Sequence, residues 1–487
     1  MMNDDFDENI GNARESHGLS WWVSDRYQRR ADNTPRRHRH QTLSDRLLAH
    51  PGRLTIAYFA DLIVIVTLVL LLPISSRQEG STDMPTAFFT AVSALSTCGI
   101  PVVNMAEHWT IFGQAVILVS IQLGGLGVMT FSSIIALFIS RRLNVTQRLL
   151  TASELGTTKL SEIKAVLQVV AISTFCIEAF TMLALFPGLF NLNNHHVGRT
   201  LWEALFYAVS SYNNTGFTPD ATGLHVQSWA VGLPVLVAAF IGTLGYPVIL
   251  NLTRCARRRD RPRKWSLNTK LTLVTTFALV GLNLVWFLIA EWNNASVFAQ
   301  ANPSDKLRGA LSAAVMPRSS GFDLSWVGEV SDPTKVVMSA MMFIGGGSSS
   351  TAGGIRVTTF AVLMLICRAA FTGRSSVTVF RRRLPERTLI TAVSVTIACF
   401  ALVFCSAIAL MIVTGRNLTD TLFEACSAFS LGGYTLGVAS PDNPVTLFIL
   451  AAAMIVGRLG PMTIAYAINR PHPSEPINYP PENIVVG

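Results

Sequence analysis

The chain has 487 residues, of which 50% are hydrophobic and 14% are charged, and its formal net charge is +9. This composition excludes an ordinary soluble domain and indicates a polytopic membrane protein, because several apolar runs are long enough to cross about 30 Å of hydrocarbon as helices. The basic surplus indicates no nucleic-acid partner, since Lys and Arg collect on one side of a membrane. The seven cysteines show no CxxC spacing and indicate neither a disulfide framework nor a zinc site.

Residues 1–53 form a polar, basic arm before the first apolar run. The arm is rich in Arg and His around residues 36–40 and lacks the apolar core of a cleavable signal peptide. We expect a disordered cytoplasmic segment on compositional grounds. A lipid-binding or regulatory role is the alternative.

Eight apolar segments then predict membrane-spanning helices. They fall into four consecutive pairs, and a shorter apolar run lies between the two members of each pair. We therefore expect an all-α integral membrane protein. The predicted spans are residues 54–72, 111–139, 163–186, 229–252, 271–290, 334–370, 389–413 and 445–468.

Each of the four shorter runs repeats one pattern around a glycine. Ala lies eight residues before the Gly, and Ser usually lies six residues before it. Each run is too short to span a bilayer and predicts a re-entrant half-helix. The tetrapeptides around the glycines are Thr97, Cys98, Gly99 and Ile100; Asn214, Thr215, Gly216 and Phe217; Ser319, Ser320, Gly321 and Phe322; and Leu431, Gly432, Gly433 and Tyr434.

These four tetrapeptides predict a carbonyl-lined cation filter. A half-helix whose C-terminus points inward places partial negative charge on the axis, and Gly accepts backbone angles that turn successive carbonyls toward a common centre. Rings of carbonyls replace the hydration shell of K+, whereas a side-chain filter would need acidic residues, which the tetrapeptides lack. The competing interpretation is that the glycines only ease turns between helices. Their shared register with the upstream Ala and Ser favours the filter.

The second helix of three pairs carries a further glycine repeat, at residues 124–127, 242–245 and 457–460. These positions fall near mid-membrane, below the expected filter, and small residues there permit close helix contact. The last repeat contains Arg458, and an Arg at the centre of a spanning helix costs about 2.5 to 3.5 kcal/mol on insertion scales. We expect Arg458 to face the pore and to donate to loop carbonyls; a buried structural pair is the alternative.

The sixth predicted span is too long for one helix, and a run rich in Gly and Ser interrupts it. We expect this run to break the helix and to leave a loop inside the membrane that obstructs a pore. A phosphate-binding loop is excluded, since no Lys follows a correctly spaced Gly in the GxxxxGK[ST] pattern. The run comprises Gly345, Gly346, Gly347, Ser348, Ser349, Ser350, Thr351, Ala352, Gly353 and Gly354.

Lys and Arg favour the cytoplasmic ends of spans, and 29 of the 38 fall in segments that we place inside. Both termini are therefore expected in the cytoplasm, including the tail at residues 471–487, and the glycine segments are expected to face outward. This assignment counts Arg318 among the outer residues, whereas Arg356 and Arg458 stay within apolar segments.

At these residues the chain resembles the Trk/Ktr/HKT superfamily of potassium transporters, and most closely its KtrB-type ion-conducting subunits. The resemblance covers about residues 50–470 and is strongest at residues 344–360, which look like the family's intramembrane gating loop. Residues 89–95, 213–217, 318–322 and 457–461 also match, the last with Arg458 at the place of the family's pore arginine. The absence of two additional helices before the first pore unit favours the KtrB type over TrkH-like members.

The resemblance implies four pseudo-symmetric M1-P-M2 repeats, with eight transmembrane helices and four re-entrant pore helices around a central pore. It implies K+ uptake across the plasma membrane by a homodimer in membrane lipid, gated by a cytoplasmic KtrA-type ring of RCK subunits. No Rossmann-like GxGxxG motif occurs in the chain, so ATP or ADP is expected on that partner. The expected repeats are residues 54–140, 141–253, 254–372 with the gating loop 345–356, and 373–470.

The fourth tetrapeptide departs from the KtrB pattern, because Leu431 and Gly432 stand where Thr and Val are expected. The loss of a hydroxyl removes a coordinating oxygen and leaves the carbonyls, so the preference for K+ over Na+ stays open.

A secondary transporter of another cation or an organic solute would also use broken helices. Such a transporter is expected to have inverted repeats, whereas the repeats of this chain run parallel. An intramembrane hydrolase lacks support, since HExxH and recurring Ser/His or Asp pairs are absent. No enzymatic activity is expected.

Overall fold

The computed structural model describes residues 51–77, 81–127, 163–220, 228–259, 261–298, 302–318, 320–322, 326–374 and 376–460. Contacts within the chain separate residues 1–49 from residues 50–487, and every described residue belongs to the second unit. The expected N-terminal arm up to residue 50, the C-terminal tail and Ser319 lie outside the described residues.

The described residues are almost entirely helical, which confirms the expected all-α class. By length and composition, three of these helices can cross a membrane, and a bent pair counts as a fourth span if it is taken as one. The three are α9 (Ile163–Leu192), of which residues from Val170 pass the test, α13 (Leu267–Ala290) and α18 (Glu386–Thr414). Shorter apolar helices occupy other predicted spans: α3 (Pro51–Leu70), α6 (Ile111–Leu126), α17 (Val357–Phe371) and α20 (Pro444–Leu459).

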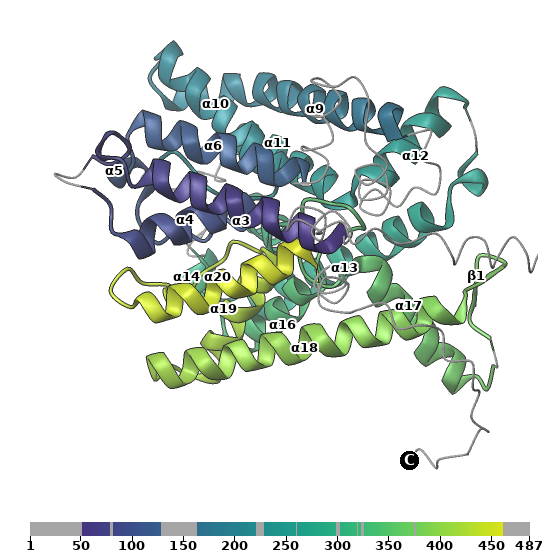
Figure 1. Cartoon of the computed structure of the whole chain (residues 1–487). Helices are drawn as coiled ribbons and strands as arrows, with labels where there is room; N and C mark the ends of the chain where they lie inside the picture. Colours follow the sequence, from purple (N-terminus) through teal and green to yellow (C-terminus); the bar gives the residue numbers. More distant parts are fainter. Residues whose placement is uncertain are drawn as a thin grey trace, which may run out of the picture. The chain divides into compact units, whose positions relative to one another are not determined.

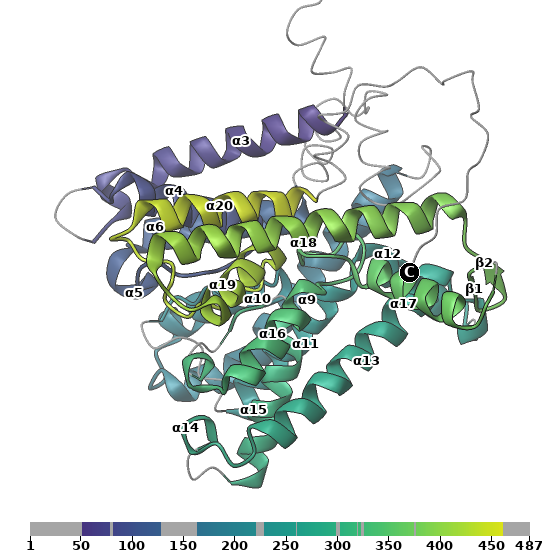
Figure 2. The same ribbon diagram turned by 90° about the horizontal axis from the view of Figure 1, so that it is seen from below.

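Four short helices precede the four glycine segments. They are α4 (Met84–Ser96), α10 (Val197–Tyr212), α15 (Pro303–Val315) and α19 (Leu418–Ser430). Pro near the first position of α4 and α15 suits a helix start, where the missing N–H is not needed. α10 packs against α9 and α11 (Trp229–Leu244), and α19 packs against α16 (Asp332–Phe343), α18 and α20. The late helix α20 also packs against the early helix α4, which brings the two ends of the described chain together (Figure 2).

Three helices in the predicted spans end at the last Gly of their glycine repeat. α6, α11 and α20 stop at Gly127, Gly245 and Gly460, whose φ angles are +81°, +85° and +80°. At Gly245 the chain turns by 99° into α12 (Tyr246–Arg257). A side chain there is excluded, since a Cβ on Gly245 would collide with the carbonyl of Ser348. The expectation of one continuous helix over residues 229–252 was therefore wrong.

The glycine- and serine-rich run interrupts its helix, as the sequence predicted. α16 ends at Phe343 and α17 begins at Val357, so residues 344–356 form a loop between them. The loop has a narrow neck, where Ile344 and Ile355 form a parallel bridge and the N–H of Gly345 donates to the carbonyl of Ile355 at 3.0 Å.

Short elements connect the helices. α17 and α18 are joined by an antiparallel hairpin of β1 (Thr378–Val379) and β2 (Arg382–Arg383), which lies beyond the end of α17 in both views (Figures 1 and 2). The remaining elements are η1 (Pro73–Ser75), α5 (Met105–His108), η3 (Pro262–Lys264), α14 (Ala295–Phe298), η4 (Met316–Arg318) and η5 (Val327–Glu329).

The largest core cluster forms around the short helices, whereas the long helices expose apolar side chains. Phe89, Phe206 and Phe423, from three different short helices, are all buried. Leu183 of α9 and Ile289 of α13 are largely exposed. Large exposed apolar faces of this kind mark a surface that meets lipid rather than water, which agrees with a multi-pass membrane protein.

Candidate functional site

The glycines of the four segments share a left-handed backbone conformation. The glycine of each segment has a positive φ: +81° at Gly99, +87° at Gly216, +54° at Gly321 and +78° at Gly433. The residue two positions earlier is also left-handed in the first, second and fourth segments: Thr97 (φ 60°), Asn214 (φ 56°) and Leu431 (φ 59°). Thr, Asn and Leu differ in size and polarity, and non-glycine residues rarely adopt this region. The common geometry of these three segments is therefore a property of the backbone at this place.

The four glycines meet the neighbouring segments in cyclic order. A Cβ on Gly99 would collide with the second segment, one on Gly216 with the third, one on Gly321 with the fourth, and one on Gly433 with the first. The last contact closes the ring. The atoms met, in this order, are Thr215 O, Ser320 O, Gly433 Cα and Cys98 O. Backbone carbonyls thus converge where the four segments meet, and no side chain fits between them.

The repeated Ser, six residues before the glycine, forms hydrogen bonds with the backbone of two of the segments. Ser93 Oγ accepts from the N–H of Gly99 at 3.0 Å and donates to the carbonyl of Ile100 at 3.3 Å. Ser210 Oγ donates to the carbonyl of Phe217 at 2.8 Å. Ser427 Oγ of the fourth segment is buried without a partner. The third segment has Val315 at this position. The hydrogen bonding of this position to the segment backbone therefore differs among the four segments.

The glycine repeats of the following helices pack on the ends of the short helices. A Cβ on Gly124, Gly242 or Gly457 would collide with a backbone carbonyl in the last turn of the preceding short helix. The carbonyls are those of Leu95, Tyr212 and Phe429, each four residues before its segment's glycine. Close helix packing therefore accounts for the first Gly of each repeat.

The interrupting loop lies directly against the glycine segments. Thr97 Oγ1 donates to the carbonyl of Thr351 at 3.1 Å, and the Asn214 amide lies 2.7 Å from Thr351 Oγ1. The N–H of Gly353 donates to the carbonyl of Ser430 at 3.1 Å. Thr351 therefore contacts polar side chains of the first two segments, while Gly353 contacts the end of α19.

Three arginines hold this loop. Arg458 Nη1 donates to the carbonyl of Thr351 at 2.5 Å, and its Nη2 donates to the carbonyl of Gly124; a loop carbonyl was the acceptor that we expected. Arg356 donates to the carbonyls of Gly347 and Ala352 at 3.3 and 2.6 Å. Arg318, which the charge count placed in an outer segment, is buried and donates to the carbonyl of Gly345 at 3.0 Å.

Two buried carboxylates beside the glycine segments were missed by the sequence reasoning. Glu178 of α9 accepts from Asn213 Nδ2 at 3.1 Å and from Gln122 Nε2 at 3.2 Å, directly behind the second segment. Glu424 of α19 accepts from Thr435 Oγ1 at 2.7 Å and from the N–H of Leu436 at 2.9 Å, just after the fourth segment. A lone acidic residue inside an apolar run is the signal that would have found Glu178.

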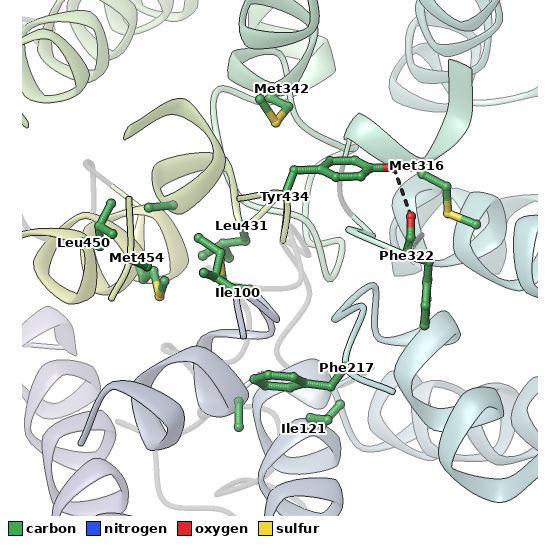
Figure 3. Packing of buried hydrophobic residues seen from close by; sticks show 14 of the residues in the cluster. Ile100, Ile121, Phe217, Met316, Phe322, Met342, Leu431, Tyr434, Leu450 and Met454 are labelled. Atoms are coloured by element: carbon green, nitrogen blue, oxygen red, sulfur yellow. Dashed lines mark hydrogen bonds between the residues drawn. The ribbon is translucent and has the colours of Figure 1, made fainter. Parts of the chain in front are cut away.

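The residues that follow the glycines pack into the surrounding core. Figure 3 shows Tyr434 directed toward Phe322, whose carbonyl accepts its hydroxyl hydrogen bond at 3.2 Å. Phe217 lies beside Ile121, and Leu431 beside Ile100. The structure thus brings the described residues of the four predicted segments, the loop and Arg458 to one place.

The sequence matches the family model TrkH, described as a cation transport protein, over residues 32–479. The chain belongs to the TrkH family. A relative in this family, Ktr system potassium uptake protein B of Bacillus subtilis (strain 168), is 31% identical over 90% of this chain and 96% of that protein. Ktr system potassium uptake protein B of Vibrio alginolyticus is 28% identical, over 89% and 94%. Potassium/sodium uptake protein NtpJ of Enterococcus hirae is 28% identical, over 90% and 97%.

The fold of this TrkH-family chain is also similar to a solved structure. The crystal structure of the potassium transporter TrkH from Vibrio parahaemolyticus matches with a TM-score of 0.65 and 17% identity, over 89% of this chain and 87% of that one. The resemblance to KtrB-type members of the Trk/Ktr superfamily is confirmed. As a TrkH-family member the chain is a membrane-embedded cation transport protein and not an enzyme.

Proposed function

We propose that this chain carries K+ into the cell across the plasma membrane, through a filter lined by the carbonyls of the four glycine segments. The closed ring made by Gly99, Gly216, Gly321 and Gly433 carries the proposal, because carbonyls that converge on one axis replace the hydration shell of K+. The names of the Ktr relatives support the choice of ion. A membrane potential drives the uptake, at about 2.3 kcal/mol per charge per 100 mV.

The proposed architecture is four M1-P-M2 repeats around this axis, with eight transmembrane helices. Four helix triplets support it, since each places a short helix between two helices of a predicted pair. The triplets are α3, α4 and α6; α9, α10 and α11; α13, α15 and α16; and α18, α19 and α20. In this arrangement each short helix is a pore helix whose C-terminal carbonyls favour a cation on the axis.

Side-chain oxygens add to the carbonyls in this proposal. Thr215 Oγ1 is buried without a protein partner in the second segment, and a buried hydroxyl without a hydrogen bond costs free energy unless a ligand satisfies it. A K+ ion that passes through the ring would provide such a ligand. Thr97, which lies one position earlier in the first segment, contributes another hydroxyl, and this hydroxyl now donates to the loop.

The loop from Gly345 to Gly354 is the proposed gate, and the present arrangement is its closed form. The contacts of Thr351 with Thr97, Asn214 and Arg458 support this role, because they place loop backbone against the inner end of the proposed filter. Opening would break these hydrogen bonds together. Arg458 adds a positive charge that opposes cation flow while the loop is closed.

Regulation is proposed to come from a second protein. A homodimer of this chain, with both termini in the cytoplasm, would stand on a KtrA-type ring of RCK subunits that binds ATP or ADP. Among the described residues the only strands are β1 and β2, with two residues each, so a nucleotide-binding sheet is not formed by this part of the chain. The names of the Ktr-system relatives support a multi-component uptake system.

A channel that passes Na+ as well as K+ is the second candidate. Leu431 favours it, because the fourth segment offers an aliphatic side chain where the first and second offer Thr97 and Asn214. The relative NtpJ, named for potassium and sodium uptake, belongs to the same family. The two candidates share the path and the gate and differ only in selectivity.

The deciding experiment measures rubidium uptake by cells that lack their own potassium uptake systems. The chain is expressed with and without a KtrA-type partner, and unlabelled K+ or Na+ is added as competitor. We expect uptake that K+ blocks and that the partner increases. Equal competition by Na+ would favour the second candidate. No uptake in either case, with the protein shown to be in the membrane, would refute the proposed function.

A further inference from the structure

The hairpin between α17 and α18 has a turn that its residues disfavour. β1 and β2 pair directly on either side of a two-residue turn formed by Phe380 and Arg381. Both residues have positive φ angles, 46° and 64°. Turns of this kind normally carry Asn-Gly, because a Cβ is strained in this region. A strained backbone that persists without a visible gain to the hairpin itself points to a role for the side chains that it presents.

The position of the hairpin is fixed by α18. This helix has 29 residues and is about 44 Å long, which matches a bilayer of about 40–45 Å including its headgroups. Its first turn, at Glu386, therefore lies among the headgroups, and the hairpin that ends just before it at Arg383 lies at the same level. Val377 and Leu384 anchor the base of the hairpin in a core cluster with residues of α17 and α18.

Basic side chains gather at this level, and the described residues give them few neutralising partners. The exposed arginines of described residues 368–387 are Arg368, Arg374, Arg381, Arg382, Arg383 and Arg387, against one exposed acid in the same range, Glu386. No ion pair among the described residues includes any of these arginines. Lys270 of α13 joins the same surface, with its Nζ 5.8 Å from the centre of the Phe380 ring. The charges repel one another and favour an anionic partner.

Exposed aromatic rings lie beside these charges. Phe380 at the tip of the turn is 49% exposed, and Phe371 at the end of α17 is 91% exposed. The preference of basic residues for one side of a membrane accounts for the arginines. That preference does not account for Phe380, an aromatic residue in the strained turn of the hairpin. A ring at the boundary of the acyl chains with guanidinium groups above it fits a phospholipid surface, since guanidinium binds phosphate oxygens in a bidentate way.

We propose that this hairpin surface, formed by Phe371 and residues 378–387, binds the phosphate headgroups of anionic phospholipids. Phe380 enters the acyl boundary, and Arg381, Arg382 and Arg383 contact the headgroups. The inference does not depend on which ion the chain transports. An acidic protein surface would meet the same charges from the water side, and the tests below exclude or establish that alternative.

The first test measures lipid retention by native mass spectrometry on the full-length protein in detergent. Phosphatidylglycerol or phosphatidylcholine is titrated against the wild type and against the variant Arg381→Gln, Arg382→Gln, Arg383→Gln. We expect phosphatidylglycerol binding to weaken at least about tenfold in the variant, with phosphatidylcholine unchanged. The matched control is Arg257→Gln, Arg258→Gln, Arg259→Gln, which removes the same charge from exposed positions at and after the end of α12 and is expected to bind like the wild type. Equal losses in both variants would refute a specific surface.

The second test asks whether the strained turn itself serves lipid binding. The variant Phe380→Asn, Arg381→Gly introduces the preferred turn residues, so we expect a higher thermal midpoint together with weaker phosphatidylglycerol binding. Wild-type lipid binding in this variant would overturn the proposal, and a lower midpoint would show that the turn is not strained. Full competition by inorganic phosphate would assign the surface to a free anion, and unchanged lipid binding with loss of a cytoplasmic partner would assign it to a protein.

Discussion

Arg318 Nη2 donates a hydrogen bond of 3.0 Å to the backbone carbonyl of Gly345. Arg318 is the last residue of η4, which directly follows the third short helix α15, and Gly345 lies at the neck of the interrupting loop. This bond therefore joins the proposed filter to the proposed gate. Arg318 is only 2% exposed, and its Nε has no partner. A hydrogen bond to a charged group contributes about 1.5 to 3 kcal/mol, and more is lost when a buried partner is left unpaired.

Arg318→Gln should therefore destabilise the closed loop. We expect partner-independent rubidium uptake to rise by roughly tenfold or more, since about 1.4 kcal/mol corresponds to a tenfold change in the equilibrium. Arg318→Lys keeps the charge without the planar fork and should give an intermediate rise. Uptake in cells that lack the regulatory partner measures both.

Deleting residues 347–353 provides the control for Arg318. The deletion should itself raise the leak, because it removes Thr351 and most of the loop. Arg318→Gln should then add nothing further in the deletion background. An equal additional rise there would mean that Arg318 supports only the third glycine segment, and a fall in flux after the deletion, with assembly intact, would contradict a gate.

Glu178 should stabilise the second glycine segment. Its carboxylate accepts from Asn213 and Gln122, and Asn213 directly precedes Asn214. Glu178→Ala removes the acceptor of the half-buried Gln122 Nε2, which costs about 1 to 3 kcal/mol when left unsatisfied, whereas Asn213 Nδ2 keeps Gln122 Oε1 and the carbonyl of Val209 as acceptors. We expect a lower thermal midpoint and a smaller preference for K+ over Na+. Glu107→Ala, at an exposed acid on α5, is the control; equal effects of the two would show that the loss of charge alone is responsible.

Gly433→Ser should reduce the preference for K+ without abolishing folding. A Cβ at this position would lie 2.6 Å from the carbonyl oxygen of Cys98 and would push the fourth segment away from the first. Gly437→Ser is a matched control, because Gly437 has nearly the same φ, +76° against +78°, but a Cβ there would meet only Arg416 Nη2, at 4.0 Å. Competition by K+ and Na+ in the uptake assay measures the effect. Unchanged selectivity in Gly433→Ser would refute the filter assignment at this position.

Acidification should weaken the outer junction of α13 and α16 through Glu291. Burial alone would raise the pKa of Glu291, but hydrogen bonds from Ser331, Thr334 and Asn294 together hold the pKa below its ordinary value. A lowered pKa stabilises the fold above the unfolded value of about 4.3, and this contribution is lost as the pH falls through the folded pKa. We expect the thermal midpoint of the wild type to fall more steeply below about pH 4 than that of Glu291→Gln. Parallel curves would exclude Glu291 as the titrating group.

The sequence predicted the glycine segments and the interrupting loop because both depend on residue types with a strong local effect. Four glycines in register mark places where the chain adopts backbone angles that other residues avoid, and a run of Gly and Ser is a poor helix former. The acceptor of Arg458 followed from the cost of burying a charge without a partner. The family was likewise recognised from these segments and is confirmed by the comparison with known proteins.

The misses have a physical reason as well. Gly accepts positive and negative φ equally, so the sequence does not say that Gly127, Gly245 and Gly460 end their helices. The contact of Arg318 with Gly345 was not predicted, because a charge count assigns a side of the membrane and no partner. This contact joins η4 to the loop between α16 and α17, and such a pairing follows from packing and not from local pattern.

All four glycine segments of the ring belong to one chain. A substitution can therefore alter one segment and leave the other three unchanged. In a pore of four identical subunits, a substitution alters four positions at once and the ring keeps its symmetry. Here Leu431 places an aliphatic side chain in the fourth segment, next to Gly353 of the loop. The equivalent positions of the first and second segments, Thr97 and Asn214, are polar. Ion preference and the fit between ring and loop can thus be adjusted separately, one residue at a time.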